Sequence, residues 1–255
     1  MKRRVRMIIQ YDGTNYEGWQ RQLTGMGIQQ IMEEELFKLT GHECVLNASG
    51  RTDSGVHALA QVAHFDTDCR IPAEKFAFAL NTGLPRDIRV VYSDEAPQGF
   101  HARFDVKRKH YRYAVKNTRH DCPFTRNYAL HYHWKLDMAK LNEAAAMFVG
   151  EHDFKAFMAV GVKPKSTVRT IYSSEWKEEN GLLVFNVAGS GFLYNMVRIM
   201  VGAMLQYGQN RNTDGIRLAL ETGKRDYAGP TAPAHGLTLA RVQYDGFDTA
   251  DIVKP

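Results

Sequence analysis

The chain has 255 residues, of which 44% are hydrophobic and 24% charged, a composition ordinary for a soluble globular protein and long enough for one large domain or two smaller ones. Lys and Arg number 33 against 28 Asp and Glu, a formal charge of +5, which permits nucleic-acid binding without establishing it. No run approaches the roughly 20 apolar residues of a membrane span, and the N-terminus lacks the apolar region of a signal peptide, so a soluble, cytoplasmic protein is expected.

Strand and helix signals alternate over the first hundred residues. Apolar β-type residues 5–10 end at the turn signal Asp12-Gly13, and apolar residues at helical spacing over 28–39 end at Gly41. Further strands are predicted at 45–49, 61–66 and 88–92, with a second helix at 72–80. This β-α-β-β-α-β order is that of ferredoxin-like domains.

The second half repeats a mixture of strands and helices. Strands are predicted at 111–115, 171–176, 183–187 and 237–244, and helices at 138–148 and 194–206. Asn180-Gly181 indicates a hairpin turn. We therefore expect an α+β fold in which two ferredoxin-like units join into a mostly antiparallel mixed sheet. The predicted division is an N-terminal domain at 1–105, a C-terminal domain at 106–248 and a tail at 249–255.

The most informative segment is GRTDSGVHA at residues 50–58, between two strand signals. Its glycines allow positive φ and a close backbone approach to a ligand. Asp53 beside Arg51 would be ionised and able to act as a nucleophile or an electrostatic stabiliser. Taken alone, the residues favour the plainer alternative, a surface turn with an Arg–Asp ion pair, because turns are rich in Gly, Asp and Ser.

This segment resembles the signature of the tRNA pseudouridine synthase A family, and other segments match that family in the same order. They are YDGT at 11–14, WQ at 19–20, FHARF at 100–104, KHYRY at 109–113, GFLYNMVR at 191–198, AP at 232–233 and GL at 236–237. The resemblance spans nearly the whole chain and includes the pseudouridine synthase fold.

The resemblance implies an isomerase that converts uridine to pseudouridine at positions 38, 39 and 40 of the tRNA anticodon stem-loop. It implies no cofactor and no metal, a homodimer, and Asp53 as the nucleophile. A carboxylate suits the reaction, because breaking the N1–C1′ bond develops positive charge on the sugar. The sequence leaves open whether Asp53 attacks C1′, attacks the base or removes a sugar proton.

The resemblance also assigns roles to residues around the nucleophile. Tyr111 matches the active-site tyrosine that stacks on uracil and serves as a possible general base, and Arg198 matches the arginine that pairs with Asp53. Arg51 is expected to hold a nucleotide flipped out of the stem. The plainer alternatives are a core tyrosine, which fits Tyr113 better, and phosphate contacts for the arginines.

Three further residues are expected to bind substrate. His57 lies in the signature, although a structural hydrogen bond is the favoured interpretation of it. Lys109 and Arg112 belong to a run in which cations and aromatic residues interleave, a composition that suits RNA. Strand alternation places Lys109, Tyr111 and Tyr113 on one face and Arg112 on the other.

Two other function classes stay open on the residues alone. A ferredoxin-like sheet can bind single-stranded RNA without catalysis, and a small-molecule glycosidic enzyme is a weaker alternative. Cys44, Cys69 and Cys122 are odd in number and far apart, so they are predicted to be packing residues of a reduced protein, with neither a disulfide framework nor a zinc site. The histidines lack metal-binding spacing.

Overall fold

The computed structural model describes residues 2–22, 24–161 and 164–253. The chain divides into two compact units, Met1–Lys107 with Thr238–Pro255, and Arg108–Leu237. The predicted division at 1–105, 106–248 and 249–255 stays a prediction, because compactness does not show which segments fold independently.

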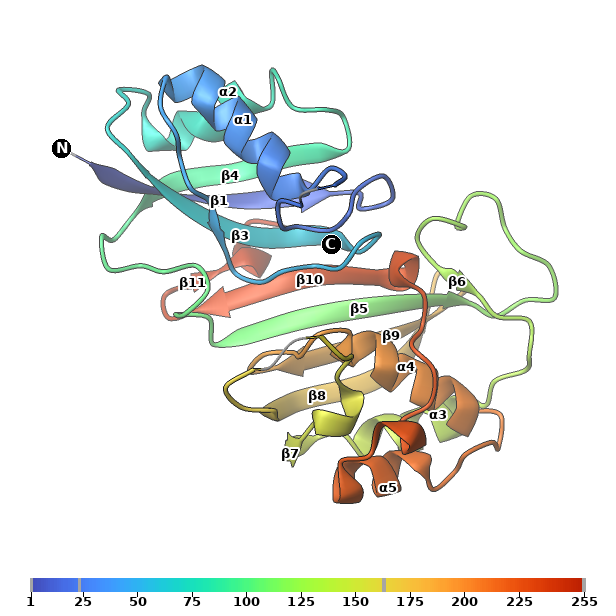
Figure 1. Cartoon of the computed structure of the whole chain (residues 1–255). Helices are drawn as coiled ribbons and strands as arrows, with labels where there is room; N and C mark the ends of the chain where they lie inside the picture. Colours follow the sequence, from blue (N-terminus) through green and yellow to red (C-terminus); the bar gives the residue numbers. More distant parts are fainter. Residues whose placement is uncertain (1, 23, 162–163, 254–255) are drawn as a thin grey trace. The chain divides into compact units, whose positions relative to one another are not determined.

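The first unit has the predicted β-α-β-β-α-β order (Figure 1). Its elements are β1 (Arg3–Tyr11), α1 (Ile28–Thr40), β2 (Asn47–Ala48), β3 (His57–Thr67), a 3₁₀ turn (Ala73–Lys75), α2 (Phe76–Leu80) and β4 (Ile88–Ala96). Strand β1 is antiparallel to both β3 and β4, and β2 pairs with β3. The C-terminal segment of this unit adds β10 (Leu237–Tyr244), parallel to the start of β3, and β11 (Phe247–Asp248).

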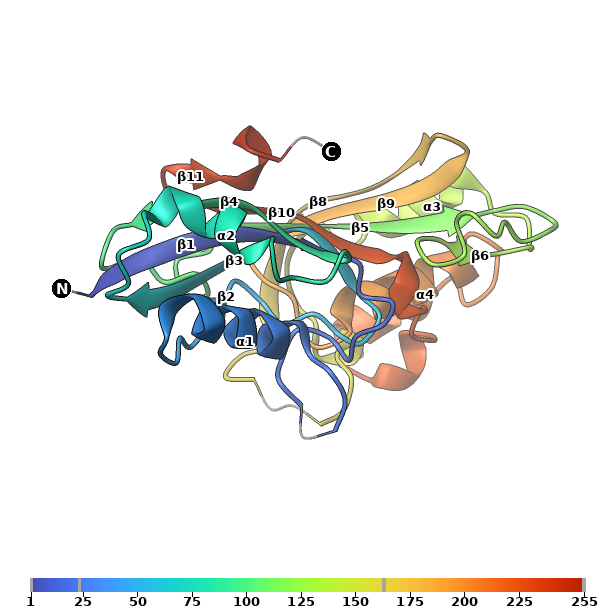
Figure 2. The same ribbon diagram turned by 90° about the horizontal axis from the view of Figure 1, so that it is seen from above.

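Both faces of β1 are covered, which explains why the consecutive residues Met7, Ile8 and Ile9 are all apolar. On one face lies α1, which buries Ile28, Met32 and Leu36, and Figure 2 shows β11 on the other side of the strands from α1. There Arg6 stacks on the ring of Phe247, 3.4 Å from its centroid, and pairs with Asp94. A strand buried on both faces loses polar–apolar alternation.

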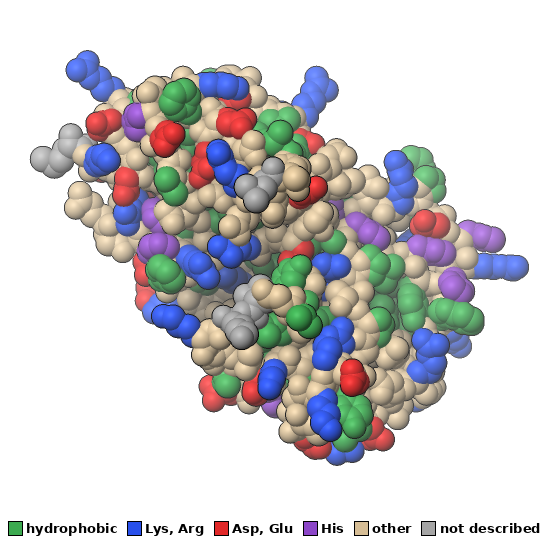
Figure 3. Space-filling view, viewed as in Figure 1, with side chains coloured by type: hydrophobic (Ala, Val, Ile, Leu, Met, Phe, Trp, Pro, Cys, Tyr) green, Lys and Arg blue, Asp and Glu red, His purple; other side chains and the backbone are tan. Residues whose placement is uncertain are grey.

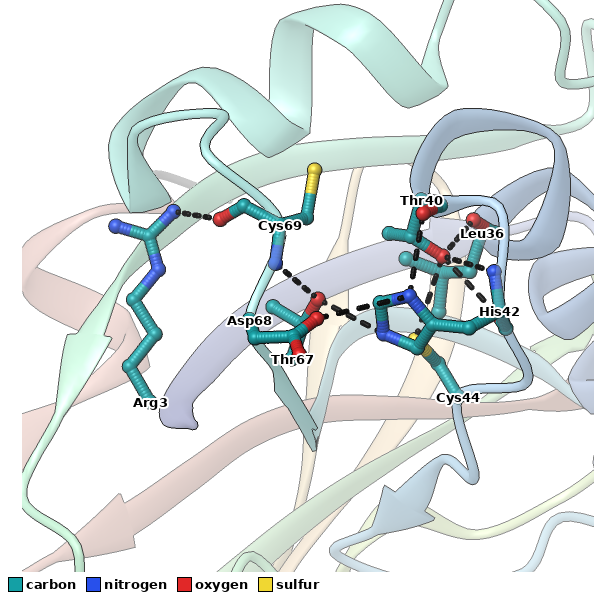
Figure 4. Close-up of polar contacts among 8 residues, drawn as sticks. All are labelled: Arg3, Leu36, Thr40, His42, Cys44, Thr67, Asp68 and Cys69. Carbon is teal, nitrogen blue, oxygen red and sulfur yellow. Dashed lines mark hydrogen bonds and ion pairs between the residues drawn. The ribbon is translucent and has the colours of Figure 1, made fainter. Parts of the chain in front are cut away.

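A polar cluster fixes the end of α1 to the end of β3 (Figure 4). The helix stops at Gly41, whose φ of 74° is the left-handed conformation that glycine adopts without strain. The next residue, His42, lies 3.1 Å from the Thr67 hydroxyl through Nε2. Cys44 is buried beside this cluster, and burial raises the pKa of its thiol. The prediction of a packing cysteine is therefore confirmed for Cys44. Cys69 and Cys122 are half-buried, and hydrogen bonds from the backbone of Phe124 and from Thr125 lower the pKa of the Cys122 thiol.

The second unit carries the strand order β5-β9-β8-β7. Its elements are β5 (Arg108–Lys116), β6 (Leu130–His131), α3 (Met138–Ala146), β7 (Gly150–Asp153), a 3₁₀ turn (Lys155–Phe157), β8 (Val168–Glu179), β9 (Leu182–Gly189), α4 (Met196–Tyr207), α5 (Gly215–Thr222) and two further 3₁₀ turns (Arg225–Tyr227 and Ala234–Gly236). Asn180 and Gly181 both have positive φ, 51° and 73°, as a two-residue type I′ hairpin requires. The predicted hairpin is confirmed.

Helix α4 forms the centre of this unit's core. Met196, Met200 and Met204 lie on one side of the helix and are all buried, so they pack the core. Trp176 of β8 donates from Nε1 to the sulfur of Met204. No helix in the described part of the chain is both long and apolar enough to cross a membrane.

The segment around β6 contains only a short strand. β6 comprises Leu130 and His131, which pair with the end of β5. Beyond them Tyr132 donates its N–H to Lys116. Figure 3 shows histidine, cationic and apolar side chains gathered around β6.

The α+β class is confirmed, since each unit combines helices with a largely antiparallel sheet. From β5 to β10 the α-helices and strands follow one another as β5, β6, α3, β7, β8, β9, α4, α5 and β10. This contains the β-α-β-β-α-β order of the first half with β6, β7 and α5 added, so the predicted repetition of element order is observed only in outline.

Candidate active site

Asp53 stands at the first position of a tight turn. Its carbonyl oxygen accepts from the N–H of Val56 at 3.1 Å, and Gly55 has φ 77°. Positive φ at the third residue of a four-residue turn is the mark of type II, which favours glycine there. The signature therefore encodes a turn that leaves the Asp53 side chain half-buried.

Residues 13–19 form a cradle for this turn. Trp19 donates its N–H to the carbonyl of Thr52 at 3.0 Å, and Gly55 donates to the carbonyl of Tyr16 at 3.3 Å. A Cβ on Gly13 would collide with the carbonyl oxygen of Val56, and one on Gly18 with that of Thr52. The two N-terminal motifs therefore supply the close backbone approach that holds the Asp53 turn.

Buried hydrogen bonds anchor the turn to the strands beneath it. The Tyr11 hydroxyl lies 2.8 Å from the Thr52 hydroxyl, and Gln61 donates from Nε2 to the carbonyl of Gly50 at 2.7 Å. Ser49 donates to the other end of the Gln61 amide at 2.5 Å. Burial raises the pKa of Tyr11 far above its usual range, so the anchor stays neutral. The anchoring role of Tyr11 and Gln61 could not be predicted from the sequence, because only the β1–β3 pairing brings the two residues together.

The other two signature residues in this unit have different surroundings. His57 is buried, and its Nδ1 accepts from the N–H of Gly13 at 3.0 Å. The same nitrogen lies 3.1 Å from an Asp12 carboxylate oxygen. Arg51 is exposed. His57 thus contributes a structural hydrogen bond to the cradle, whereas Arg51 reaches solvent.

The N-terminal arginines are already paired with acids in this unit. Arg4 binds Asp66 at 2.7 Å, Arg6 pairs with Asp94, and Arg3 lies 3.9 Å from Glu95. These ion pairs place the N-terminal arginines on a charged face of this unit.

Tyr111 and Tyr113 share a face of β5, as strand alternation predicts. Tyr113 is fully buried, and its hydroxyl donates to the carbonyl of Pro233 at 2.9 Å. Burial raises its pKa far above the usual range. Tyr111 lies nearer the start of β5 and packs edge-on against Phe192, with ring centroids 5.1 Å apart. Tyr113 is therefore a core residue, and Tyr111 belongs to an aromatic pair with the 191–198 motif.

Arg198 is held firmly within its own unit. Its Nη1 donates to the Asn195 side chain and its Nε to the carbonyl of Ala232, both at 2.8 Å. Ala232 donates its N–H back to the carbonyl of Arg198 at 3.0 Å. Asn195 precedes α4 in a left-handed conformation, φ 60°. The Ala232-Pro233 motif thus orients the guanidinium group, a role that the sequence alone did not assign to it.

Lys109 and Arg112 lie on opposite faces of β5. Lys109 shares the face of Tyr111 and is half-buried. Arg112, on the other face, pairs with Glu179 of β8. The two expected substrate-binding cations therefore stand in different surroundings.

Comparisons with known proteins assign the chain to a family. The family described as tRNA pseudouridine synthase matches residues 7–105 and 144–245, which include the Asp53 turn, its cradle and the Arg198 segment. The chain belongs to the tRNA pseudouridine synthase family. The enzyme class is thereby settled as an isomerase that converts uridine of tRNA to pseudouridine, and the non-catalytic RNA-binding alternative is set aside.

Curated relatives match the chain almost from end to end. It is 44% identical to tRNA pseudouridine synthase A of Ruminiclostridium cellulolyticum over 247 residues, covering 95% of this chain and 100% of that protein. It is 45% identical to the protein of the same name from Bacillus pumilus, covering 95% and 99%. Among solved structures, a chain of an archaeal box H/ACA sRNP Nop10–Cbf5 complex is 10% identical with a TM-score of 0.37, covering 91% of this chain and 60% of that chain.

Proposed function

We propose that the enzyme isomerises uridines 38, 39 and 40 in the anticodon stem-loop of tRNA, with Asp53 as its nucleophile. The observation that carries the proposal is the Asp53 turn. Residues of three motifs build it, and at two positions of its cradle only glycine fits. Such convergence on one carboxylate is typical of a side chain that must meet its substrate in a fixed geometry.

The proposed chemistry exchanges one bond to the sugar for another. The N1–C1′ bond breaks, the uracil turns while bound, and a C5–C1′ bond forms. C5 then loses its proton to a base and N1 ends protonated, so no oxidant, reductant or water is consumed. The Asp53 carboxylate stabilises or traps the positive charge that develops at C1′.

Tyr111 and Arg198 take the two supporting roles in this proposal. The Tyr111 ring stacks on uracil, and its hydroxyl takes part in removing the C5 proton. Arg198 pairs with Asp53 and keeps it ionised. The two hydrogen bonds that orient the Arg198 guanidinium support this role, since a fixed cation directs a carboxylate better than a mobile one.

The remaining assignments concern RNA binding. We propose that exposed Arg51 holds the flipped nucleotide and that Lys109, on the face of Tyr111, binds substrate beside it. His57 acts through the cradle, by its bond from Gly13. Arg112 is paired with Glu179 on the opposite face, so its assignment to substrate stays a prediction.

We further propose that the enzyme works in the cytoplasm as a homodimer, as the family resemblance implies. Light scattering tests the second point. A dimer has twice the 29.0 kDa mass of the chain, and a monomer that retains full turnover would contradict it.

The site of modification is tested with three tRNA transcripts, each carrying a single uridine among positions 38, 39 and 40. Chemical mapping of pseudouridine after incubation should find the product at the retained uridine in each transcript. A transcript with no uridine at these positions is the control. Modification elsewhere in that control would contradict the anticodon assignment while leaving the synthase activity intact.

A further inference from the structure

Arg169, near the start of β8, is a half-buried cation without an acidic partner among the described residues. Its Nη1 donates to the carbonyl oxygens of Ser166 and Val168, at 2.9 and 2.6 Å. Burial lowers its pKa, with no carboxylate raising it, whereas Asp66 raises the pKa of Arg4. The side chain stays charged at neutral pH, because the ordinary pKa of arginine lies far above neutral pH.

The sheet register places Arg169 on the face of Tyr111. Ile171 of β8 pairs with Gly189 of β9, and Gly189 pairs with Lys109 of β5. Arg169 is two residues before Ile171, and Tyr111 is two residues after Lys109. Since side chains two apart share a face, all of them point to the same side of the sheet.

The Arg169 guanidinium also reaches the turn that follows β9. A Cβ placed on Gly191 would lie 3.6 Å from Arg169 Nε, and the next residue, Phe192, packs on Tyr111. Thr170 and Ser190 fasten this turn to β8 through two hydrogen bonds, at 2.9 and 3.1 Å. Arg169 is therefore held near the aromatic pair within one rigid segment.

We propose that Arg169 is a substrate-binding residue that holds a phosphodiester of the RNA strand beside the uracil stacked on Tyr111. The proposal rests on the proposed function, since it takes Tyr111 as the platform for the base. The desolvation cost of a half-buried guanidinium is offset when an anion accepts its remaining donors. Arginine suits a phosphate because its planar donors fit two phosphate oxygens at once.

Binding of an anticodon stem-loop RNA tests this role across a salt series. Arg169→Gln should weaken binding about tenfold at low salt and reduce the slope of log Kd against log salt by about 0.7, the value for one contact to single-stranded RNA. Arg169→Lys should keep the slope. The matched control is Arg217→Gln, which removes an exposed arginine already paired with Asp214 and Glu221 on α5 and should change neither quantity.

A neutral methylphosphonate at each of the two phosphates flanking the target uridine then identifies the contact. At one of these two phosphates, the methylphosphonate should weaken RNA binding to the wild-type enzyme and to Arg169→Lys. It should not weaken RNA binding to Arg169→Gln. An unchanged slope in Arg169→Gln, or equal losses for all variants at both phosphates, would overturn the proposal. If Arg169→Gln does not fold, the wild type and Arg169→Lys decide through the methylphosphonate alone.

The proposed function is tested separately, by turnover of the same RNA by the wild-type enzyme. Turnover with no phosphate effect at Arg169 would reject this inference alone. A phosphate effect without turnover would instead reject the catalytic assignment and leave the phosphate contact standing.

Discussion

Asp53 owes its position to backbone packing more than to side-chain contacts. Its turn rests against residues 13–19 through main-chain hydrogen bonds, and Gly18 approaches Thr52 so closely that no side chain fits. The family resemblance of the signature at 50–58 predicts Asp53 as the nucleophile, and the residues alone favoured a surface turn. The cradle could not be predicted, because the only sign of two closely packed backbones in a sequence is an isolated glycine.

Replacement of Gly18 by alanine tests the cradle. The added methyl group would collide with the Thr52 carbonyl, and the backbone has φ 83°. We therefore expect the variant to lose about 1–3 kcal/mol of stability and to lose most of its turnover. Gly41→Ala is the matched control, since Gly41 also has positive φ (74°) but nothing lies within 4 Å. It should cost about 1 kcal/mol from strain and keep full turnover. Thermal unfolding and kcat report both effects, and equal turnover in the two variants would contradict the cradle's role.

The two tyrosines of β5 give a paired prediction. Tyr111→Phe should retain RNA binding and lower kcat about 100-fold, the lower end of what a general base contributes. Tyr113→Phe should keep kcat and lose about 1 kcal/mol of stability, because it removes the hydrogen bond to Pro233. Steady-state kinetics and denaturant unfolding separate the two. A kcat loss confined to Tyr113→Phe would reverse the assignment.

His64 makes stability depend on pH in a defined window. The ring is buried, its Nδ1 accepts from the N–H of Ala102 at 3.1 Å, and burial with nearby Arg4 and His101 lowers its pKa from 6.5 to about 4. The unfolded chain therefore binds this proton more tightly than the folded one. The stability that comes from keeping His64 neutral is fully present above pH 6.5. As the pH falls towards 4, the free energy of unfolding decreases by at most about 3 kcal/mol from this group.

Urea unfolding at several pH values measures the His64 effect. His64→Gln keeps a hydrogen-bond acceptor without a titratable ring, so the slope of stability between pH 6.5 and 4 should flatten. Arg4 lowers the pKa of Asp66 from 3.8, so the stability that this carboxylate contributes is lost at pH values below the range used for His64. An unchanged slope in His64→Gln would contradict the assignment.

Among the elements, those with a local cause were predictable. Gly41 ends α1 and Asn180-Gly181 turns the β8–β9 hairpin, each because a left-handed conformation is needed at that residue. The short elements were predicted less well. β2 comprises only two residues of the strand expected at 45–49, because its extent depends on a pairing partner elsewhere in the chain. The eight residues of α5 were not predicted, since they are too few for a periodic pattern to stand out.

Helix α4 and the 230–233 segment depend on each other. A Cβ on Gly202 would collide with the carbonyl oxygen of Pro230, and Ala232 in the same segment accepts from Arg198. Gly202→Ala should therefore shift the segment that orients Arg198 and lower kcat at least tenfold, although alanine favours helix. Ala203→Gly is the control, expected to lose about 1 kcal/mol of stability through helix propensity while kcat is kept. Full activity of Gly202→Ala would show that this packing does not orient Arg198.

At the scale of the whole molecule, element order and family were within reach of the sequence, and the partners of individual side chains were not. The motifs occur along the chain in the order expected for the family, and the family match covers both halves of the chain. The ion pairs of Arg4 and Arg112 and the anchoring of Arg198 could not be predicted. Each of these interactions depends on which strand or loop packs next to the arginine. The sequence of one segment does not determine which other segment pairs with it in the sheet.

We propose Asp53 as the nucleophile of this pseudouridine synthase. Tritium release from tRNA carrying [5-³H]uridine tests this assignment, because C5 loses its hydrogen only when the new C5–C1′ bond forms. We predict release by the wild-type enzyme and none by Asp53→Asn, with tRNA binding nearly unchanged in the variant. Release by Asp53→Asn at the wild-type rate would contradict the claim that Asp53 is the nucleophile.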